Sequence, residues 1–160
     1  MDIIKYIITD ACISDCKEIL SLQKLCYIQE AEIYQDYSIQ PLSQTIEDIE
    51  IEFHKSVVLK CVYAEKIIGS VRAFDDNNTC RIGKLIVHPD FQNIGIGKEL
   101  MKQIEKFFPD SKRFELFTGE KSIKNISLYQ KLGYSIFKRE EIKPSLELVF
   151  LEKINSGLKF

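Results

Sequence analysis

The stretch QNIGIGK, residues 92–98, separates an apolar, strand-like run at 81–87 from an amphipathic, helix-like pattern at 98–108. Gly95 and Gly97 allow a tight turn at this junction, because glycine adopts positive φ without steric cost. The helix that follows begins with unpaired amide N–H groups and carries about half a positive charge at its start. The stretch therefore predicts a loop that binds phosphate.

The spacing of the two glycines limits which phosphate ligand the loop can hold. A nucleoside-triphosphate loop needs GxxxxGK followed by Ser or Thr, but Glu99 follows Lys98 and position 92 is Gln. A dinucleotide-binding loop needs a third glycine where Leu100 stands, and no acidic partner for a ribose lies at the expected distance. The first class is excluded and the second is disfavoured. The pattern that remains is Q-x-x-G-x-G, at Gln92, Gly95 and Gly97.

The bulk composition is that of an ordinary soluble protein. The chain of 160 residues, 45% hydrophobic and 29% charged, predicts a single domain, 1–160. A net charge of −2 excludes a global field that recruits nucleic acid or an anionic membrane. Five cysteines without a CxxC pair and two histidines predict no metal site. The odd number of cysteines, the lack of a leader pattern and the lack of an apolar run of ~18 residues indicate a cytoplasmic protein.

Apolar periodicity and turn residues predict an α/β fold, in which a mixed β-sheet is flanked by helices on both faces. The expected order is β-α-α-β-β-β-α-β-α-β-β. The first helix carries Ile19, Leu22, Cys26 and Ile33 at helical spacing, and the second begins with a Thr45–Asp48 capping box. Gly133 is expected to end the last helix in the left-handed conformation. We expect strands at 3–8, 57–64, 67–74, 79–87, 113–118, 134–141 and 146–152, and helices at 14–33, from 45, 98–108 and 122–132.

Two segments on these elements resemble motifs of one family. Residues 85–97, LIVHPDFQNIGIG, resemble the acetyl-CoA-binding motif of the GNAT superfamily of N-acetyltransferases. Residues 125–134, NISLYQKLGY, resemble that family's second motif, LYxKLGF. The two motifs stand in the family's order on the expected elements. The resemblance covers 81–134, whereas the first 80 residues match in the order of their elements alone.

The resemblance implies a GNAT-like fold that binds acetyl-CoA as a cosubstrate, with no metal, and transfers its acetyl group directly to a primary amine. The strands at 79–87 and 113–118 would splay apart and hold the thioester between them. Tyr129 would stand beside the sulfur as the catalytic acid, Asn125 beside the pantetheine, and Lys131 at the ribose 3′-phosphate. Leu85, Ile86 and Val87 would supply main-chain groups for the pantetheine and the oxyanion. The pyrophosphate would bind the main chain of Gln92, Asn93, Ile94, Gly95, Ile96, Gly97 and Lys98.

The acceptor side carries a run of negative charge. Residues 27–54 contain no Lys or Arg but seven carboxylates. Those at 47–52 are explained as a solvated helix face. Other residues lie in the segment that forms the acceptor wall in the family: Glu30, Glu32 and Asp36, interleaved with Tyr27, Tyr34 and Tyr37. This pattern suits a cationic amine such as a polyamine, an amino sugar or a lysine-like group, on a small molecule or a protein. Glu30 and Glu32 are candidates for the base or for an anchor.

Several assignments stay open from sequence alone. His88, before Pro89, is interpreted as a loop residue, and Glu115 is equally compatible with the cleft and with solvent. A homodimer contact through the last strands is a candidate that no pattern tests. The alternative function is a catalytically silent acyl-CoA-binding sensor or partner subunit. The presence of Tyr129 disfavours that alternative, because a sensor needs no acid.

Overall fold

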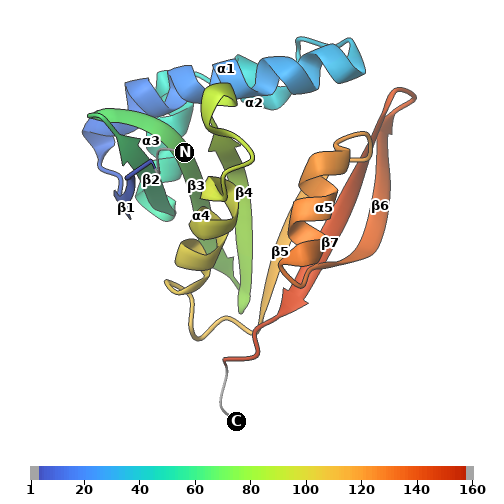
Figure 1. Ribbon diagram of the computed structural model, residues 1–160. Helices are drawn as coiled ribbons and strands as arrows, with labels where there is room; N and C mark the ends of the chain where they lie inside the picture. The colour runs from blue at the N-terminus through green and yellow to red at the C-terminus, as the bar shows by residue number, and fades with distance from the viewer. Residues whose placement is uncertain (1–3, 158–160) are drawn as a thin grey trace.

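The computed structural model describes residues 4–157 as one seven-stranded mixed sheet in the order β1-β2-β3-β4-β5-β7-β6, with helices on both faces. The expected α/β architecture is confirmed (Figure 1). The strands are β1 (Ile7–Asp10), β2 (Val57–Tyr63), β3 (Lys66–Asp76), β4 (Thr79–Val87), β5 (Arg113–Gly119), β6 (Ser135–Lys143) and β7 (Leu146–Ile154). The α-helices are α1 (Cys16–Tyr34), α2 (Gln40–Ser43), α3 (Ile46–Lys55), α4 (Ile96–Glu105) and α5 (Ile123–Lys131), and 3-10 turns occur at Ile13–Asp15 and Pro89–Phe91.

Local sequence signals place most element ends. The Thr45 hydroxyl accepts from Asp48 N at 3.1 Å, and the Asp48 carboxylate accepts from Thr45 N at 2.9 Å, so the capping box is confirmed. Gly133 has φ 98° and follows α5, as expected. Each of these ends is decided within one helical turn, which explains why the sequence predicts it.

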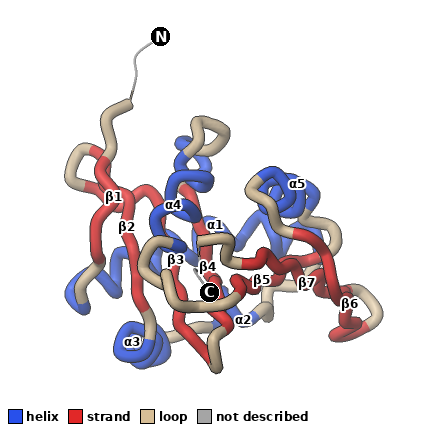
Figure 2. The backbone as a smooth tube through the Cα atoms, turned by 90° about the horizontal axis from the view of Figure 1, so that it is seen from below, coloured by secondary structure: helices blue, strands red, loops and turns tan. Residues whose placement is uncertain are grey.

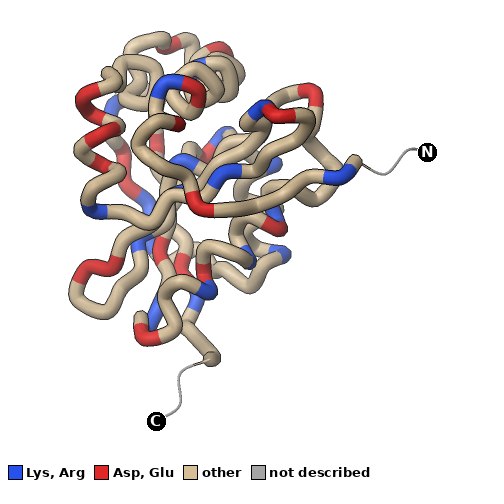
Figure 3. The backbone as a smooth tube through the Cα atoms, turned by 90° about the vertical axis from the view of Figure 1, so that its left-hand side faces the viewer, with Lys and Arg blue, Asp and Glu red and all other residues tan. Residues whose placement is uncertain are grey.

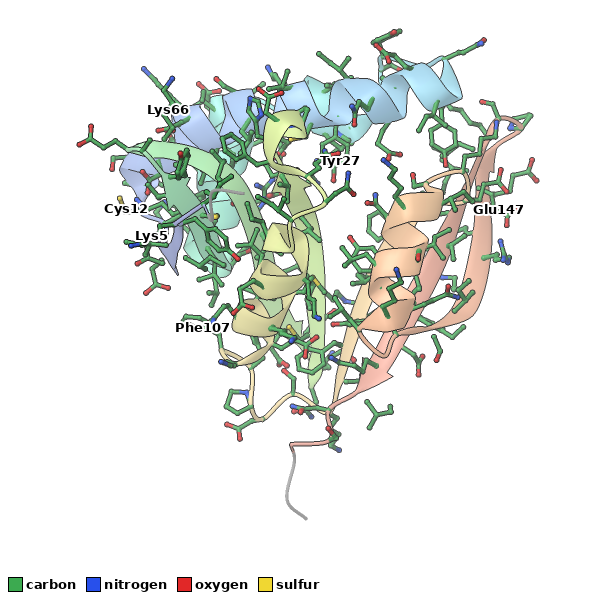
Figure 4. The ribbon with its side chains drawn as sticks, viewed as in Figure 1. Lys5, Cys12, Tyr27, Lys66, Phe107 and Glu147 are labelled. Carbon is green, nitrogen blue, oxygen red and sulfur yellow. The ribbon has the colours of Figure 1, made fainter. Side chains whose placement is uncertain are left out.

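Three expected boundaries are wrong for identifiable reasons. The first strand begins at Ile7, opposite Val62, because β2 ends at the next residue, Tyr63, and offers no partner to residues before 6. Ile3, the expected start, lies outside the described residues. Helix α4 begins at Ile96 instead of Lys98 and ends at Glu105, since its last amides form tighter bonds three residues back. Phe107, expected within this helix, follows it as an exposed side chain (Figure 4). The short helix α2 was not expected.

Two apolar cores cover the two faces of the sheet. Helix α4 buries Leu100, Met101 and Ile104 on one face, where α5 also lies (Figure 2). The first half of α1 packs with α3 on the other face around Ile19 and Ile49. The second half of α1 continues beyond β4 and across the gap between β4 and β5 (Figure 1). Ile33 is therefore 46% exposed, although its spacing placed it on the apolar face of the helix.

Strands β4 and β5 are parallel partners over a short length only. Pairing runs from Thr79 with Arg113 to Arg81 with Glu115, and the strands then separate toward α1 (Figure 1). A β-bulge in β4 accompanies the separation, because the register with β3 shifts between Ser70 and Arg72 and Lys84 takes φ 53°. The sheet thus opens into a V.

An ion-pair cluster ties the closed end of the V. Arg81 pairs with Glu115, and Arg113 bonds both Glu115, at 2.9 Å, and Glu152, at 3.1 Å. Glu115 therefore joins β4 to β5 and lines neither cavity described below. This settles the ambiguity that strand alternation alone leaves for that residue.

Candidate active site

The glycine loop presents a row of main-chain N–H groups at the start of α4. Asn93 and Gly95 both have left-handed conformations, with φ 66° and 93°. The first main-chain bond of the helix is from Glu99 N to Gly95 O at 3.0 Å, so the amides of residues 96–98 are left for a ligand. Successive N–H groups in such a turn form a concave anion site.

The loop closes one side of a cavity of about 790 Å³, which we name the glycine-loop cavity. Its walls come from the end of β4, the loop, the start of α5 and the second half of α1. Of the residues expected to bind the donor, its lining includes Leu85, Ile86, Val87, Gln92, Asn93, Gly95, Ile96, Gly97, Lys98 and Asn125.

The edge of β4 faces this cavity with main-chain groups. His88 N donates to Ile68 O of β3 at 2.8 Å, so the Val87 carbonyl in the same peptide unit points away from β3, into the V. There it accepts from Gln92 Nε2 at 3.1 Å and from Cys26 Sγ at 3.3 Å. The Val87 N–H lies on the same edge as its carbonyl and faces the V.

A second cavity, of about 760 Å³, lies on the other side of the V and is named the Arg72 cavity. It is bounded by α1, α2, α3 and the strands on either side of the V. Tyr27, Glu30, Leu85 and Asn125 line both cavities, which therefore meet at these residues. Figure 4 shows Tyr27 below α1, at the opening between the two halves of the sheet.

Tyr27 stands at this junction, and Tyr129 lies near it. Tyr129 is 7% exposed and lines the Arg72 cavity, whereas Tyr27 lines both. Burial raises the pKa of Tyr129, and the nearby Tyr27 and Glu30 add to the effect. Burial likewise raises the pKa of Tyr27. Both phenols therefore stay protonated at neutral pH, as hydrogen-bond donors must.

The second half of α1 is joined to the β5 side of the V. The Glu30 carboxylate accepts from Ser122 Oγ at 2.5 Å, and Tyr34 Oη accepts from Lys121 N at 2.8 Å. Tyr34 packs against Gly119, where an added Cβ would lie 2.1 Å from the Tyr34 hydroxyl. The residues expected on the acceptor wall thus separate: Glu30 lies at the junction, Glu32 lines the glycine-loop cavity alone, and Tyr34 lines the Arg72 cavity alone.

Three other residues considered in the sequence analysis lie outside the two cavities or serve a local role. Lys131 is exposed at the end of α5, and Ile94 is 49% exposed; neither lines a cavity. The basic side chains that do line the glycine-loop cavity are Lys98, Lys121 and Lys124. His88 accepts from Asp90 N at 3.0 Å, in agreement with a loop role.

Sequence reasoning missed the Arg72 cavity. Arg72 and Lys84 line it, and neither lies in a motif. A signal existed for Arg72: it is the one charged residue within the apolar run 67–74, and an arginine inside a buried strand needs partners. No comparable signal exists for Lys84, whose position depends on the bulge.

Residues 17–134 match the family model described as Acetyltransferase (GNAT) family. The chain belongs to the GNAT acetyltransferase family. Among curated proteins, YqkA of Bacillus subtilis, a UPF0157 protein, is 29% identical over 133 residues, which cover 83% of this chain and 38% of YqkA. The uncharacterized N-acetyltransferase ycf52 of Porphyra purpurea is 32% identical over 88 residues, or 51% of this chain and 49% of that protein. The chain thus spans less than half the length of these two relatives.

Solved GNAT structures share the fold. The PaiA N-acetyltransferase of Thermoplasma acidophilum, crystallised with coenzyme A, gives a TM-score of 0.78 at 17% identity, over 94% of this chain and 99% of that one. YncA of Salmonella typhimurium, a putative acetyltransferase solved with acetyl-CoA, gives 0.74 at 14% identity, over 98% and 97%. At these identities the GNAT fold is what the comparison establishes.

Gly97→Ala tests the glycine loop without disturbing the fold. An added Cβ lies at least 3.5 Å from Leu128, Val87 and Leu85, so alanine fits, but it projects between β4 and α5 where a ligand approaches the amides. We expect Kd for acetyl-CoA to rise tenfold or more by calorimetry, with Tm of the free protein unchanged. Gly83→Ala is the matched control, because Gly83 lies on the other side of the V and a Cβ added there meets no atom within 4 Å. Unchanged affinity in Gly97→Ala would exclude the loop as the binding site.

Gly119→Ala tests the junction between α1 and β5. The new methyl group overlaps the buried Tyr34 ring, so Tyr34 must move and its bond to Lys121 N must break. We expect a loss of about 1–3 kcal/mol in the free energy of unfolding, as for other overpacked sites. Thermal unfolding measures this loss, again with Gly83→Ala as the control. A variant as stable as wild type would mean that Tyr34 does not hold the two halves together.

Proposed function

We propose that the protein is an N-acetyltransferase that moves the acetyl group of acetyl-CoA directly to a primary amine. One arrangement carries the proposal: a row of free amides at the start of α4 opens into the same gap as the free edge of β4, and this gap continues into a second cavity. Donor and acceptor can therefore approach from opposite sides and meet at Tyr27, Glu30, Leu85 and Asn125. The family assignment and the CoA ligands of PaiA and YncA support it.

The glycine-loop cavity offers binding groups for both the pyrophosphate and the pantetheine arm of acetyl-CoA. The amides of residues 96–98 suit the pyrophosphate, and Lys98 and Lys124 add positive charge to the same cavity. The Val87 N–H, on an unpaired strand edge, suits an amide carbonyl of the pantetheine arm, in the way a peptide adds to a sheet. Acetyl-CoA, when bound, supplies an activated acyl carbon and a thiolate leaving group.

Amine attack requires the loss of a proton, which we assign to Glu30. An alkyl ammonium has a pKa of ~10, like lysine, and the reactive form is the neutral amine. Glu30 lies where the two cavities meet, and its carboxylate is held by the Ser122 hydroxyl. It can anchor the ammonium and take its proton directly or through water. Glu32, on the donor side alone, does not suit this role.

Tyr129 is assigned as the donor to the leaving sulfur. A thiol has a pKa of ~8.5, so a phenol with a raised pKa gives up its proton to the thiolate unfavourably. The hydroxyl therefore stabilises the thiolate chiefly by a hydrogen bond, and the proton lost by the amine can complete the thiol. The Leu85 N–H, next to the bulge in β4, is our candidate donor to the oxyanion.

We also propose that residues 1–160 form a single transferase domain and that it works in the cytoplasm. The five cysteines are all free, which suits a reducing compartment. Within residues 4–157, no helix has the length and apolar character needed to cross a membrane. The side that carries β1 shows residues of both charge signs, with acidic residues gathered along α3 (Figure 3).

A thermal-shift panel of acetyl-CoA, CoA, NAD and ATP tests the donor assignment. Ligand at 100 times Kd adds about 2.7 kcal/mol to the free energy of unfolding. Each kcal/mol raises Tm by roughly 2–4 °C at this chain length. We expect stabilisation by acetyl-CoA and CoA alone. Absence of any shift with acetyl-CoA refutes the proposal, whereas a shift without thiol release over a broad amine panel identifies a silent sensor.

Tyr129→Phe tests the hydrogen bond to the leaving sulfur. We expect kcat, measured by thiol release, to fall about 10²-fold or more with Kd for acetyl-CoA unchanged, because the hydroxyl acts on the leaving sulfur. Tyr27→Phe is the matched comparison, since Tyr27 is half-buried, lines the Arg72 cavity as Tyr129 does, and lies at the junction of the two cavities. A larger fall in Tyr27→Phe would transfer the role to Tyr27. Wild-type kcat in both variants would mean that neither hydroxyl stabilises the thiolate.

A further inference from the structure

Arg72 is held rigidly in the floor of the Arg72 cavity. It is 4% exposed, and its side chain points from β3 toward α1 and α3. Nε donates to the Glu52 carboxylate at 2.5 Å, and Nη2 donates to the Gln23 and Gln44 side-chain oxygens at 2.8 and 3.1 Å. These partners fix the plane of the guanidinium.

The remaining nitrogen of Arg72 has no partner. Nη1 is the single buried side-chain nitrogen or oxygen within residues 4–157 that makes no hydrogen bond. A buried charged donor without an acceptor is unfavourable in the folded chain, and an acceptor that arrives with a ligand removes this penalty. Because Arg72 lines the cavity, Nη1 is a candidate ligand-binding group.

Lys84 brings a second positive charge to the same cavity. It occupies the bulge in β4 with φ 53°, a conformation that favours glycine over lysine. Burial lowers the pKa of its ammonium, so charge at this position is disfavoured by desolvation. Among the described residues it forms no ion pair, because Glu52 is taken by Arg72 and Asp36 by Lys143. Among the described residues, Lys84 therefore adds backbone strain and an unpaired charge, and it makes no ion pair or side-chain hydrogen bond that offsets them.

The space beside these two groups is open. Gly83 pairs with Arg72 across the two strands, so a side chain at Gly83 would lie on the same face as the guanidinium. A Cβ built there meets no atom within 4 Å. Apolar side chains form the wall on the other half of the V: Phe117, Ile142, Leu146 and Leu148. The cavity thus offers unpaired positive charge on one wall and hydrocarbon on the other.

We propose that the Arg72 cavity binds an anionic group, a carboxylate or a phosphate, that the amine acceptor carries at the end remote from its amine. This inference rests on the proposed acetyl transfer and names the substrate class for it. The acceptor spans the cavity with its ammonium at Glu30 and its anion at Arg72 Nη1 and Lys84. The acidic residues of α1 suggest a cationic acceptor. Arg72 and Lys84 restrict this class to acceptors that also carry a negative charge, and a polyamine carries none.

Matched acceptors test the anion requirement. The set is 6-aminohexanoate, its primary amide and 1,6-diaminohexane, with 6-aminohexyl phosphate and 6-aminohexanol to separate a phosphate site from a carboxylate site. Amine, chain and length are held nearly constant while the remote group changes. We expect kcat/KM to be about tenfold to hundredfold higher for an anionic acceptor than for its neutral or cationic partner, the range for hydrogen bonds to charged groups.

Lys84→Met assigns the preference to this cavity. The variant keeps the length of the side chain and removes its charge, so kcat/KM should fall about tenfold or more for the anionic acceptor and less than twofold for the amide. Lys66→Met, at the exposed start of β3 and far from Tyr27 (Figure 4), is the matched control and should match wild type. Gly83→Val should raise KM for the anionic acceptor and leave Kd for acetyl-CoA unchanged. We prefer these variants to Arg72→Met, because loss of the guanidinium would also leave Glu52, Gln23 and Gln44 without their hydrogen-bond donor.

Binding to the CoA-saturated protein keeps the inference separate from the proposed function. Calorimetry with 6-aminohexanoate, 6-aminohexyl phosphate and their uncharged partners measures the anion preference without turnover. Selective binding that Lys84→Met abolishes supports the inference even if no amine releases thiol, in which case the proposed transferase activity fails alone. Equal or better use of diaminohexane, or a preference that survives in Lys84→Met, overturns the inference and leaves the transferase proposal standing.

Discussion

The short pairing between β4 and β5 is the constraint on which the rest of the structure depends. The two strands are bonded from Thr79–Arg113 to Arg81–Glu115 and then diverge, because the bulge at Lys84 bends β4 away. A sheet that closed along its whole length would satisfy the free edge of β4 and leave no room for a ligand. The divergence creates an unpaired strand edge, and it separates two cavities that meet at one point.

The V is fixed at both ends, so the site is formed before any ligand arrives. At the closed end, Arg81 and Arg113 clamp Glu115. At the open end, the second half of α1 reaches across to β5 and α5 through Glu30–Ser122 and Tyr34–Lys121. Residues from α1 thereby take part in both cavities. A rigid frame of this kind lowers the ordering cost of binding.

Short-range signals in the sequence predicted much of this fold. The glycine loop, the Thr45 capping box and the Gly133 helix end each involve residues within one or two turns of each other, and the structure places them as expected. The predictions from sequence failed where a residue far along the chain determines an element's end or a side chain's exposure. Strand β1 begins at Ile7 because its partner, β2, ends at Tyr63. Ile33 is exposed because α1 extends beyond the part of the sheet that it covers. Lys131 had the family's sequence position but lies outside both cavities.

The sequence by itself determined the proposed donor half of the site, since a glycine loop of this kind is a local arrangement of main-chain amides at a helix start. It also determined the order of helices and strands, because the spacing of apolar residues differs between a helix and a strand. The tertiary structure alone decided the proposed acceptor half. Arg72 meets Gln23, Gln44 and Glu52 from three other segments, and Lys84 enters the cavity through a bulge defined by pairing with β3. Which charges stay unpaired depends on the packing of the whole chain, and no local pattern records it.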